Sequence, residues 1–163
     1  MGCGANILKK ILIMTFDDQY LKAMTHIITK REYALNPSIN FINFKQKNYL
    51  YTFLSNRQRW TWLHHFPGTY GTIIIYEGED TENNINEIEN ILNSKILHKR
   101  PLVLIFDKSK INNKNSQFYE TIRNNLLSKN IKMIVLFIDF SNNNYNNEIL
   151  YGLDWLYHEI NSY

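Results

Sequence analysis

Continuous apolar runs alternate along the chain with stretches in which apolar residues recur at helical spacing. The runs at 11–14, 71–76, 101–106 and 132–138 are typical of buried strands. Helices are expected between them, with inner faces made of Leu21, Met24, Ile27 and Ile28; Ile85, Ile88, Ile91, Leu92 and Ile96; Phe118, Ile122 and Leu126; and Ile149, Leu153, Leu156 and Ile160. This alternation predicts a mostly parallel sheet covered by helices on both sides.

Two further strand-like segments, at 41–44 and 49–54, are joined by a short link at 45–48. So short a connection favours an antiparallel hairpin. A brief aromatic segment follows at 60–66 and ends at a Pro-Gly pair. The expected fold class is therefore α/β, with a mostly parallel six-stranded sheet that carries one antiparallel edge hairpin.

Composition narrows the class of protein. The chain has 163 residues, of which 44% are apolar and 20% charged, as in a globular protein with one domain. The net charge of +3 is too small, and the cations too dispersed along the sequence, to predict nucleic-acid binding. Cys3 is the only cysteine, so an intrachain disulfide is excluded and a reducing compartment is the default. No segment has the apolar length of a transmembrane helix.

The first residues resemble a lipidation signal. Gly2 is the residue that N-myristoylation requires once the initiator Met is removed, and Cys3 beside it could accept palmitate. Two lipids, together with Lys9 and Lys10, would anchor the chain stably to a membrane. Asn6 stands where the motif usually has Ser or Thr, so an unmodified terminus is the alternative. We expect residues 1–8 to be flexible and residues 9–163 to form the domain.

The first strand and the helix after it meet near residues 15–18, where an open α/β sheet can hold a phosphate on the amides of a helix N-terminus. A phosphate-binding loop has the pattern G-x-x-x-x-G-K-[ST]. In this chain the four motif positions carry Thr15, Tyr20, Leu21 and Lys22. The Tyr20 ring would fill the space of a β-phosphate, and Asp17 and Asp18 add negative charge beside it. The sequence predicts that the phosphate cradle is lost.

Three other kinds of site are disfavoured by the residue pattern: a phospho-acceptor site, a metal site and a catalytic site. Asp17 and Asp18 with Lys108 suggest a phospho-acceptor receiver site, but no third Asp closes the central strand, which favours a solvated acidic loop. His64 and His65 are adjacent and lack further ligands at metal-binding spacing, so packing or surface roles are favoured. No nucleophile, base and orienting group stand in a catalytic pattern. We therefore expect no catalytic residue and no metal site.

With the order of elements fixed, the residues resemble the Arf and Arf-like branch of the small GTPases. Residues 150–156, Leu-Tyr-Gly-Leu-Asp-Trp-Leu, are similar to that family's L-Y-E-G-L-D-W-L. Residues 62–66 with Thr69 and Gly71 resemble its W-R-H-Y-F-x-x-T-x-G. Residues 37–41 resemble its switch I motif P-T-I-G-F, and Gly2 suits a family that is commonly myristoylated. The resemblance implies the P-loop NTPase fold of small GTPases, in three layers.

The residues that would contact the nucleotide depart from the family pattern. Ser38 replaces the Mg²⁺-binding Thr of switch I, and the switch II Asp and Gly are missing, with Gln58 as a loose counterpart of the water-positioning Gln. The guanine-reading N-K-x-D is replaced by Asp107, Lys108, Ser109 and Lys110. In the family, the Asp of this motif accepts two hydrogen bonds from N–H groups of guanine. Lys110 would place a cation beside those donors, which should weaken guanine binding strongly.

The resemblance then implies an Arf-like pseudo-GTPase that binds no cofactor and acts as a membrane-peripheral, cytoplasmic protein-binding module in trafficking or signalling. Its partners would be an effector or regulator protein and, through an N-terminal lipid, a membrane. The positions of the family's effector patch carry Phe41, Leu54 and His65, with Trp60 and Trp62 nearby; these side chains fill the vacated nucleotide space or bind a partner. The alternatives are an active GTPase that binds GTP or GDP with Mg²⁺ unconventionally, and a nucleotide-independent enzyme.

Overall fold

The computed structural model describes residues 7–30, 41–77, 82–110, 120–124 and 130–162. The helices and strands in this part of the chain are β1 (Lys9–Thr15), α1 (Asp18–Thr29), β2 (Phe41–Gln46), β3 (Tyr49–Leu54), the 3₁₀ helix η1 (Asn56–His65), β4 (Thr69–Tyr76), α2 (Glu82–Leu92), β5 (Leu102–Asp107), the 3₁₀ helix η2 (Lys108–Lys110), β6 (Met133–Ile138) and α4 (Asn146–Asn161). Residues 120–124 are helical as well.

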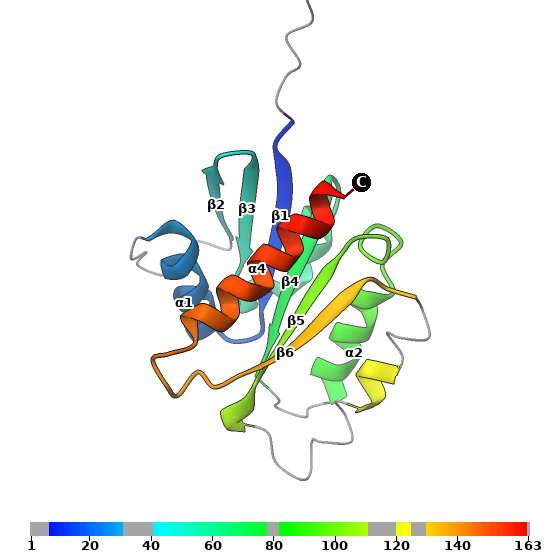
Figure 1. Cartoon of the computed structure of the whole chain (residues 1–163). Coiled ribbons are helices and arrows are strands. Elements are labelled where there is room, and N and C mark those ends of the chain that lie inside the picture. Colours follow the sequence, from blue (N-terminus) through cyan, green and yellow to red (C-terminus); the bar gives the residue numbers. More distant parts are fainter. Residues whose placement is uncertain (1–6, 31–40, 78–81, 111–119, 125–129, 163) are drawn as a thin grey trace, which may run out of the picture.

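The strands form one six-stranded sheet in the order β2-β3-β1-β4-β5-β6 (Figure 1). Every neighbouring pair is parallel except β2 and β3, which are antiparallel. The expected α/β class, mostly parallel with one antiparallel edge hairpin, is confirmed. Because β1 lies in the middle and its neighbours run the same way, the carboxyl ends of β1, β3, β4, β5 and β6 share one edge of the sheet.

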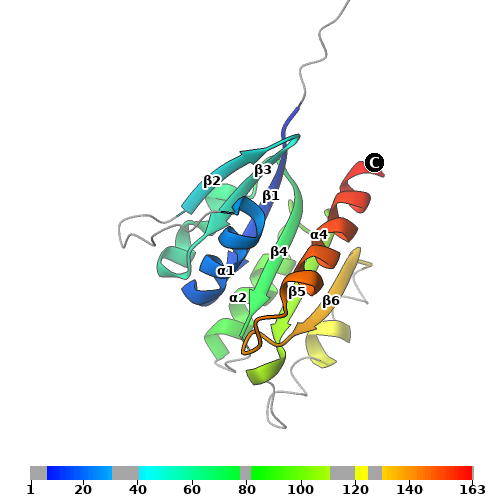
Figure 2. The ribbon, with the colours of Figure 1, turned by 60° about the vertical axis from the view of Figure 1, so that its left-hand side comes forward.

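Helices cover both faces of the sheet. Helices α1 and α4 lie on one face and α2 on the other (Figures 1 and 2). The predicted inner faces of α1 and α4 are buried, with exposures of at most 6%: Leu21, Met24, Ile27, Ile28, Ile149, Leu153, Leu156 and Ile160. They pack on β1, β4 and β5 residues such as Ile13 and Ile105, while α2 packs Ile88 and Ile91 on the opposite face.

The hairpin is tighter than the sequence predicts. β2 extends to Gln46 and pairs it with Tyr49, which leaves Lys47 and Asn48 as a two-residue turn in place of the expected link at 45–48. Lys47 takes a φ of 53°, the left-handed conformation that two-residue hairpin turns require. Lys45 and Gln46 therefore also pair with β3, opposite Leu50 and Tyr49, before the chain reverses.

One helix boundary agrees with the expectation and another differs from it. α1 begins at Asp18, within the junction expected near residues 15–18, and Asp17 caps the helix with its side chain. α2 ends at Leu92, so Ile96 lies beyond it and is 44% exposed; its inclusion in the inner face was wrong. Helical periodicity continues through Ile96, but the backbone leaves the helix at Asn93 and Ser94.

Several expected features fall outside the described residues. These are the lipidation candidates Gly2 and Cys3, the switch I counterpart Ser38, and Phe118 and Leu126 of the helix expected before the run at 132–138. Of that helix, Ile122 is buried as expected. Within the described chain, none of the helices has the length and apolar character needed to cross a bilayer.

Candidate functional site

The candidate site lies at the carboxyl edge of the sheet, where β1 passes into α1. Only Phe16 and Asp17 separate the end of β1 from the start of α1. Asp17 occupies the N-cap, and its Oδ1 accepts a hydrogen bond from the Gln19 amide at 2.9 Å. A carboxylate of the chain therefore already sits on the helix N-terminus, where a phosphate would be held. The connection is also too short to wrap around a phosphate group.

Tyr20 joins this corner to the end of β5. Its hydroxyl donates a hydrogen bond of 2.5 Å to Oδ2 of Asp107, a residue 87 positions later in the chain. Both side chains are buried, at 2% exposure each. The second carboxylate oxygen of Asp107 accepts the Ser109 amide at 2.9 Å and the Ser109 hydroxyl at 2.6 Å. Both oxygens of this buried carboxylate thus have donors, which is what allows it to remain buried.

The Tyr20 ring is enclosed from two sides. Phe140, just after β6, meets it edge to face with centroids 4.7 Å apart, and Lys110 places its Nζ 5.6 Å from the ring centroid. Burial, followed by the hydrogen bond to Asp107, raises the pKa of the Tyr20 hydroxyl far above its ordinary value. The phenol is therefore a permanently protonated donor, and it has no use as a base or nucleophile at neutral pH.

Asp18 forms a second polar cluster on the other side of the corner. Its Oδ2 accepts the Arg57 Nε at 2.7 Å, while its Oδ1 accepts the Ser55 hydroxyl at 3.0 Å and the Asn56 amide at 3.3 Å. Asp18 thereby ties α1 to the start of η1. Asp17 and Asp18 are therefore both engaged in structural contacts. A receiver site would also need an Asp at the end of the central strand, and β4 is followed there by Glu77.

The remaining motif positions do not converge on a common centre. Thr15 is fully buried, and no hydrogen bond to its Oγ1 is found within the described part of the chain. Leu21 is buried in the core beneath α1, whereas Lys22 and Lys108 point to exposed positions. Lys110 is held near the Tyr20 ring. No cation therefore faces an open phosphate position at this corner among the residues that the structure describes.

The described residues at this corner offer the phosphates of GTP or GDP no free helix N-terminus. The space between β1, α1 and β5 is filled by the Tyr20 and Phe140 rings, and the helix N-terminus is occupied by Asp17. Ser38, the candidate Mg²⁺ ligand, lies outside the described residues, as does any account of the Gln58 side chain. A carboxylate at Asp17 and another at Asp18 would also repel the phosphates.

The histidine pair lies in the last turn of η1. Within the described ranges, His, Cys, Asp and Glu residues nowhere gather in the threes that could hold a metal ion. His64 is exposed, and His65 is partly buried near Lys10, whose ammonium donates to the His65 carbonyl. Burial, followed by the Lys10 charge, lowers the pKa of the His65 imidazole. The partly buried His65 ring is therefore mainly neutral at pH 7.

The expected protein-interaction patch needs a correction. Leu54 is fully buried, and Trp62 is 1% exposed, with its indole donating to the Ser55 carbonyl at 2.9 Å. Trp62 packs edge to face on Phe16, whose ring centroid is 5.5 Å away, so it belongs to the core. The side chain of Phe41 lies outside the description. Leu54 and Trp62 therefore belong to the core and not to an exposed surface.

The exposed apolar residues of the same segment are Trp60 and Leu63. They are 73% and 63% exposed and stand three residues apart on η1. In a 3₁₀ helix, residues at this spacing lie on the same side, so the two side chains form one apolar surface. The sequence placed Trp60 beside the family's effector patch but did not single out Leu63, and the aromatic run gives no sign of which tryptophan turns inward.

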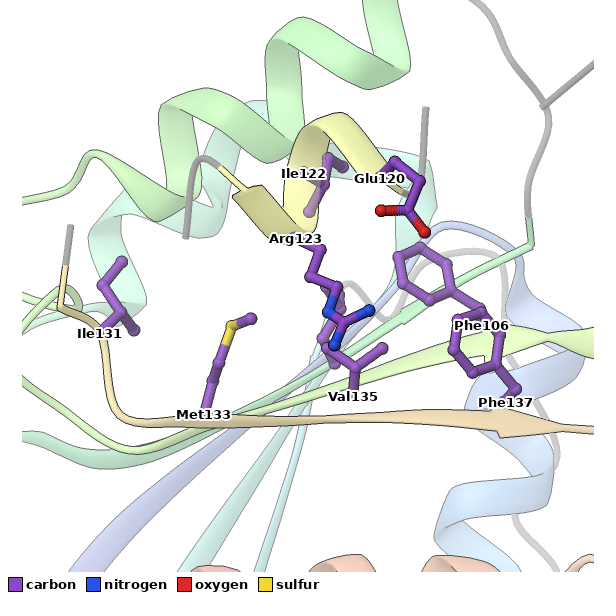
Figure 3. A pocket seen from close by; sticks show the side chains of 9 residues that line it. Phe106, Glu120, Ile122, Arg123, Ile131, Met133, Val135 and Phe137 are labelled. Atoms are coloured by element: carbon purple, nitrogen blue, oxygen red, sulfur yellow. The ribbon is translucent and has the colours of Figure 1, made fainter. Parts of the chain in front are cut away.

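A cavity of about 480 Å³ lies on the face of the sheet that α2 covers, between β5, β6 and the helical residues 120–124 (Figure 3). Its described lining is mostly apolar and includes Phe106, Met133 and Val135. Glu120 and Arg123 are its only described charged residues, and Arg123 reaches towards Val135 in Figure 3. The cavity can accept an apolar group, but its described lining holds no catalytic set.

The Tyr20–Asp107 pair is the feature of the site that sequence reasoning missed. Tyr20 was expected to block the phosphate position, but its partner was unknown because 87 residues separate the two. One signal could have found it: the ends of parallel strands meet at one edge, and Asp107 ends a buried strand. Phe140 and Arg57 had no such signal, because both lie in irregular segments or 3₁₀ structure.

Comparison with known proteins gives no family assignment. No protein-family model matches the chain, and no curated protein matches it significantly in sequence.

Proposed function

We propose that this protein is a nucleotide-independent member of the small-GTPase-like folds, an Arf-like pseudo-GTPase that works as a membrane-peripheral protein-binding module. One observation carries the proposal: Tyr20 closes the β1–α1 corner through its buried hydrogen bond to Asp107. A switch needs two conformations with different ligand contacts, and a corner closed by its own side chains offers a nucleotide no such contacts.

The fold supports the proposal at a coarser level. The sheet order β2-β3-β1-β4-β5-β6, with β2 alone antiparallel, is compatible with a P-loop NTPase scaffold. The Arf-like resemblance at 62–71 falls on η1 and the start of β4, and that at 150–156 falls on α4. In both stretches the structure explains the residue types by packing: Trp62, Gly71, Leu153 and Leu156 are all buried.

Partner binding is assigned to the exposed pair Trp60 and Leu63. Large exposed apolar side chains on a folded domain are typical of protein interfaces, and tryptophan is among the residues that contribute most there. The proposed membrane attachment rests on Gly2 and Cys3 as lipid acceptors.

The first experiment measures the melting temperature of the purified chain with millimolar GTP, GDP or ATP and Mg²⁺. A ligand that binds only the folded state raises the melting temperature by mass action. We expect no shift with any nucleotide. A shift specific to GTP or GDP would overturn nucleotide independence and establish the alternative, an Arf-like GTP-binding protein with unconventional contacts.

The partner surface is tested by binding of the chain to an effector identified through proximity labelling in cells. Trp60→Ala with Leu63→Ala should weaken this binding at least ~10-fold, as expected for interface anchors. Tyr151→Ala is the matched control, since Tyr151 is 62% exposed on α4 and away from η1. Equal loss in the control, or no loss in the double variant, would place the interface elsewhere.

A further inference from the structure

The cations of this chain are dispersed in sequence but gathered in the fold. The amino-terminal edge of the sheet, opposite the candidate site, carries the first residues of β1, the β2–β3 turn and the segment that leads into β5 (Figure 1). We call this edge the basic end. Its cationic residues come from three separate stretches of chain and are Lys9, Lys10, Lys45, Lys47, Lys95, Lys99 and Arg100.

The parallel register brings these stretches together. Lys9 at the start of β1 pairs with Tyr49, which directly follows the hairpin turn, and its amide bonds the Asn48 carbonyl at 2.8 Å. Lys10 pairs with Thr69 at the start of β4. Thr72 of β4 donates its amide to Pro101, at the end of the segment that carries Lys95, Lys99 and Arg100.

Four exposed lysines at the basic end have no ion-pair partner among the described residues. Lys45, Lys47, Lys95 and Lys99 are exposed, and no ion pair involves any of them within the described ranges. The described residues at 7–10, 43–50, 63–72 and 93–102 contain no carboxylate. Glu159, near the end of α4, is nearly buried and pairs with Lys132.

The opposite end of the sheet has a different charge. There carboxylates and cations are mixed, and the charged residues are Asp17, Asp18, Asp107, Arg57, Lys108 and Lys110. The small net charge of +3 therefore hides a strong separation of charge between the two ends of the molecule.

An apolar residue completes the basic end. Ile7 lies two residues before Lys9, with Leu8 between them, and is 70% exposed. The chain that bears Gly2 and Cys3 joins the fold at this point. An exposed apolar side chain among lysines suits the boundary between lipid headgroups and acyl chains, whereas a nucleic acid would gain little from Ile7.

From this geometry we propose that the basic end docks on a membrane surface rich in anionic lipids. The lysines interact with the phosphate and carboxylate groups of the lipid headgroups, and Ile7 enters the interface. Docking this way leaves the carboxyl edge of the sheet for other contacts. The inference deepens the membrane attachment in the proposed function, but it does not require an attached lipid and is independent of nucleotide binding.

The test uses the full chain produced in bacteria, which carries no N-terminal lipid, in flotation with vesicles. One set of vesicles is phosphatidylcholine alone, and the other holds equal parts of phosphatidylcholine and phosphatidylserine. We expect binding to the second set only, weakened by added salt because the attraction is electrostatic. Lys45→Gln with Lys47→Gln should reduce the vesicle affinity ~30-fold, from the typical contribution of a lysine near an anionic surface.

The matched control changes the net charge equally at the other end of the molecule, with Lys22→Gln and Lys108→Gln, both exposed. Its vesicle affinity should stay within about threefold of the unchanged protein. Equal binding to both sets of vesicles, or equal loss in the control pair, would overturn the proposal. So would tighter binding of a DNA or RNA duplex that depends on the same lysines, which would assign the basic end to nucleic acid. Unchanged circular dichroism confirms that each variant is folded.

Discussion

At the scale of single residues, the hydrogen bond between Tyr20 and Asp107 decides what the β1–α1 corner can do. Asp107 is a buried carboxylate, and a charge taken out of water is tolerated only when donors replace the water. Tyr20 supplies one of those donors from another element, and Ser109 supplies the rest locally. Tyr20 thus has two effects. Its ring fills the space that a phosphate would need, and its hydroxyl donates a hydrogen bond to the buried Asp107 carboxylate.

Tyr20→Phe should therefore destabilise the fold by about 1–3 kcal/mol, the usual penalty for leaving a buried acceptor without its donor. The ring is kept, so the loss reports the hydroxyl alone. Urea unfolding followed by tryptophan fluorescence measures it. Tyr145→Phe is the control, because no hydrogen bond of the Tyr145 hydroxyl is found in the described part of the chain, and its stability should hardly change. Equal stability of the two variants would contradict the role given to the pair.

The Lys132–Glu159 pair predicts a pH dependence. The hydrogen bond and charge of Lys132 lower the pKa of the Glu159 carboxyl below its ordinary value of 4.5. The pair's stabilisation is then present above that pH and is lost as the pH falls through the lower pKa of the folded state, because the unfolded chain takes up the proton first.

Lys132→Gln should accordingly be less stable than the unchanged protein at neutral pH, with the difference shrinking as the pH falls below 4.5. Urea unfolding across this range measures the difference. The comparison is made in a His158→Gln background, since the His158 Nδ1 lies 3.5 Å from Glu159 and would add a second cation in acid. A difference that is independent of pH would show that Lys132 acts through packing alone.

At the scale of elements, the start of α1 determines the shape of the site. A helix that begins at Asp18 leaves a connection of Phe16 and Asp17, and Phe16 is held in the core against Trp62 and Tyr76. One residue of the connection is thus packed and the other caps the helix. No part of the connection is left to form a loop around a ligand.

Asp17→Ala should destabilise the protein by about 1 kcal/mol, because the Gln19 amide loses its acceptor at the N-cap. Asp17→Ser should keep nearly all of the stability, since serine is an equally good cap. Thermal unfolding by circular dichroism measures both variants. If Asp17→Ser lost as much as Asp17→Ala, the carboxylate would act by its charge and not as a cap.

At the scale of the whole molecule, the candidate site depends on several elements at once. Four parts of the chain fill the corner. They are β1 with Thr15, α1 with Tyr20, β5 with Asp107 and the segment after β6 with Phe140. A single substitution therefore cannot restore a phosphate cradle, because Asp17 still occupies the helix N-terminus and the connection stays short.

Tyr20→Gly tests this at the scale of the molecule. Removing the buried ring should cost at least about 3 kcal/mol, as for other large-to-small changes in cores. We expect its melting temperature to fall and not to rise again with GTP and Mg²⁺. A recovery with GTP or GDP would show that the ring alone had closed an otherwise competent site.

Much of the fold could be predicted because it depends on local patterns. Apolar runs such as that at 71–76 and the helical spacing of Leu153 and Leu156 arise from which faces must be buried, and both were confirmed. Ile96 shows the limit of the method, since periodicity continues past the point where the backbone leaves the helix. The absence of the phosphate-loop glycines is read directly in the sequence, and it matters because glycine at those positions meets a local backbone requirement.

The sequence by itself determined the α/β class, the hairpin and the absence of a phosphate-loop motif. Only the tertiary structure decided that Tyr20 reaches Asp107, that Trp62 is buried while Trp60 is exposed, and that scattered lysines share one end of the sheet. The reason is physical: periodicity reports which face of an element is apolar, whereas strand order and register decide which distant side chains become neighbours.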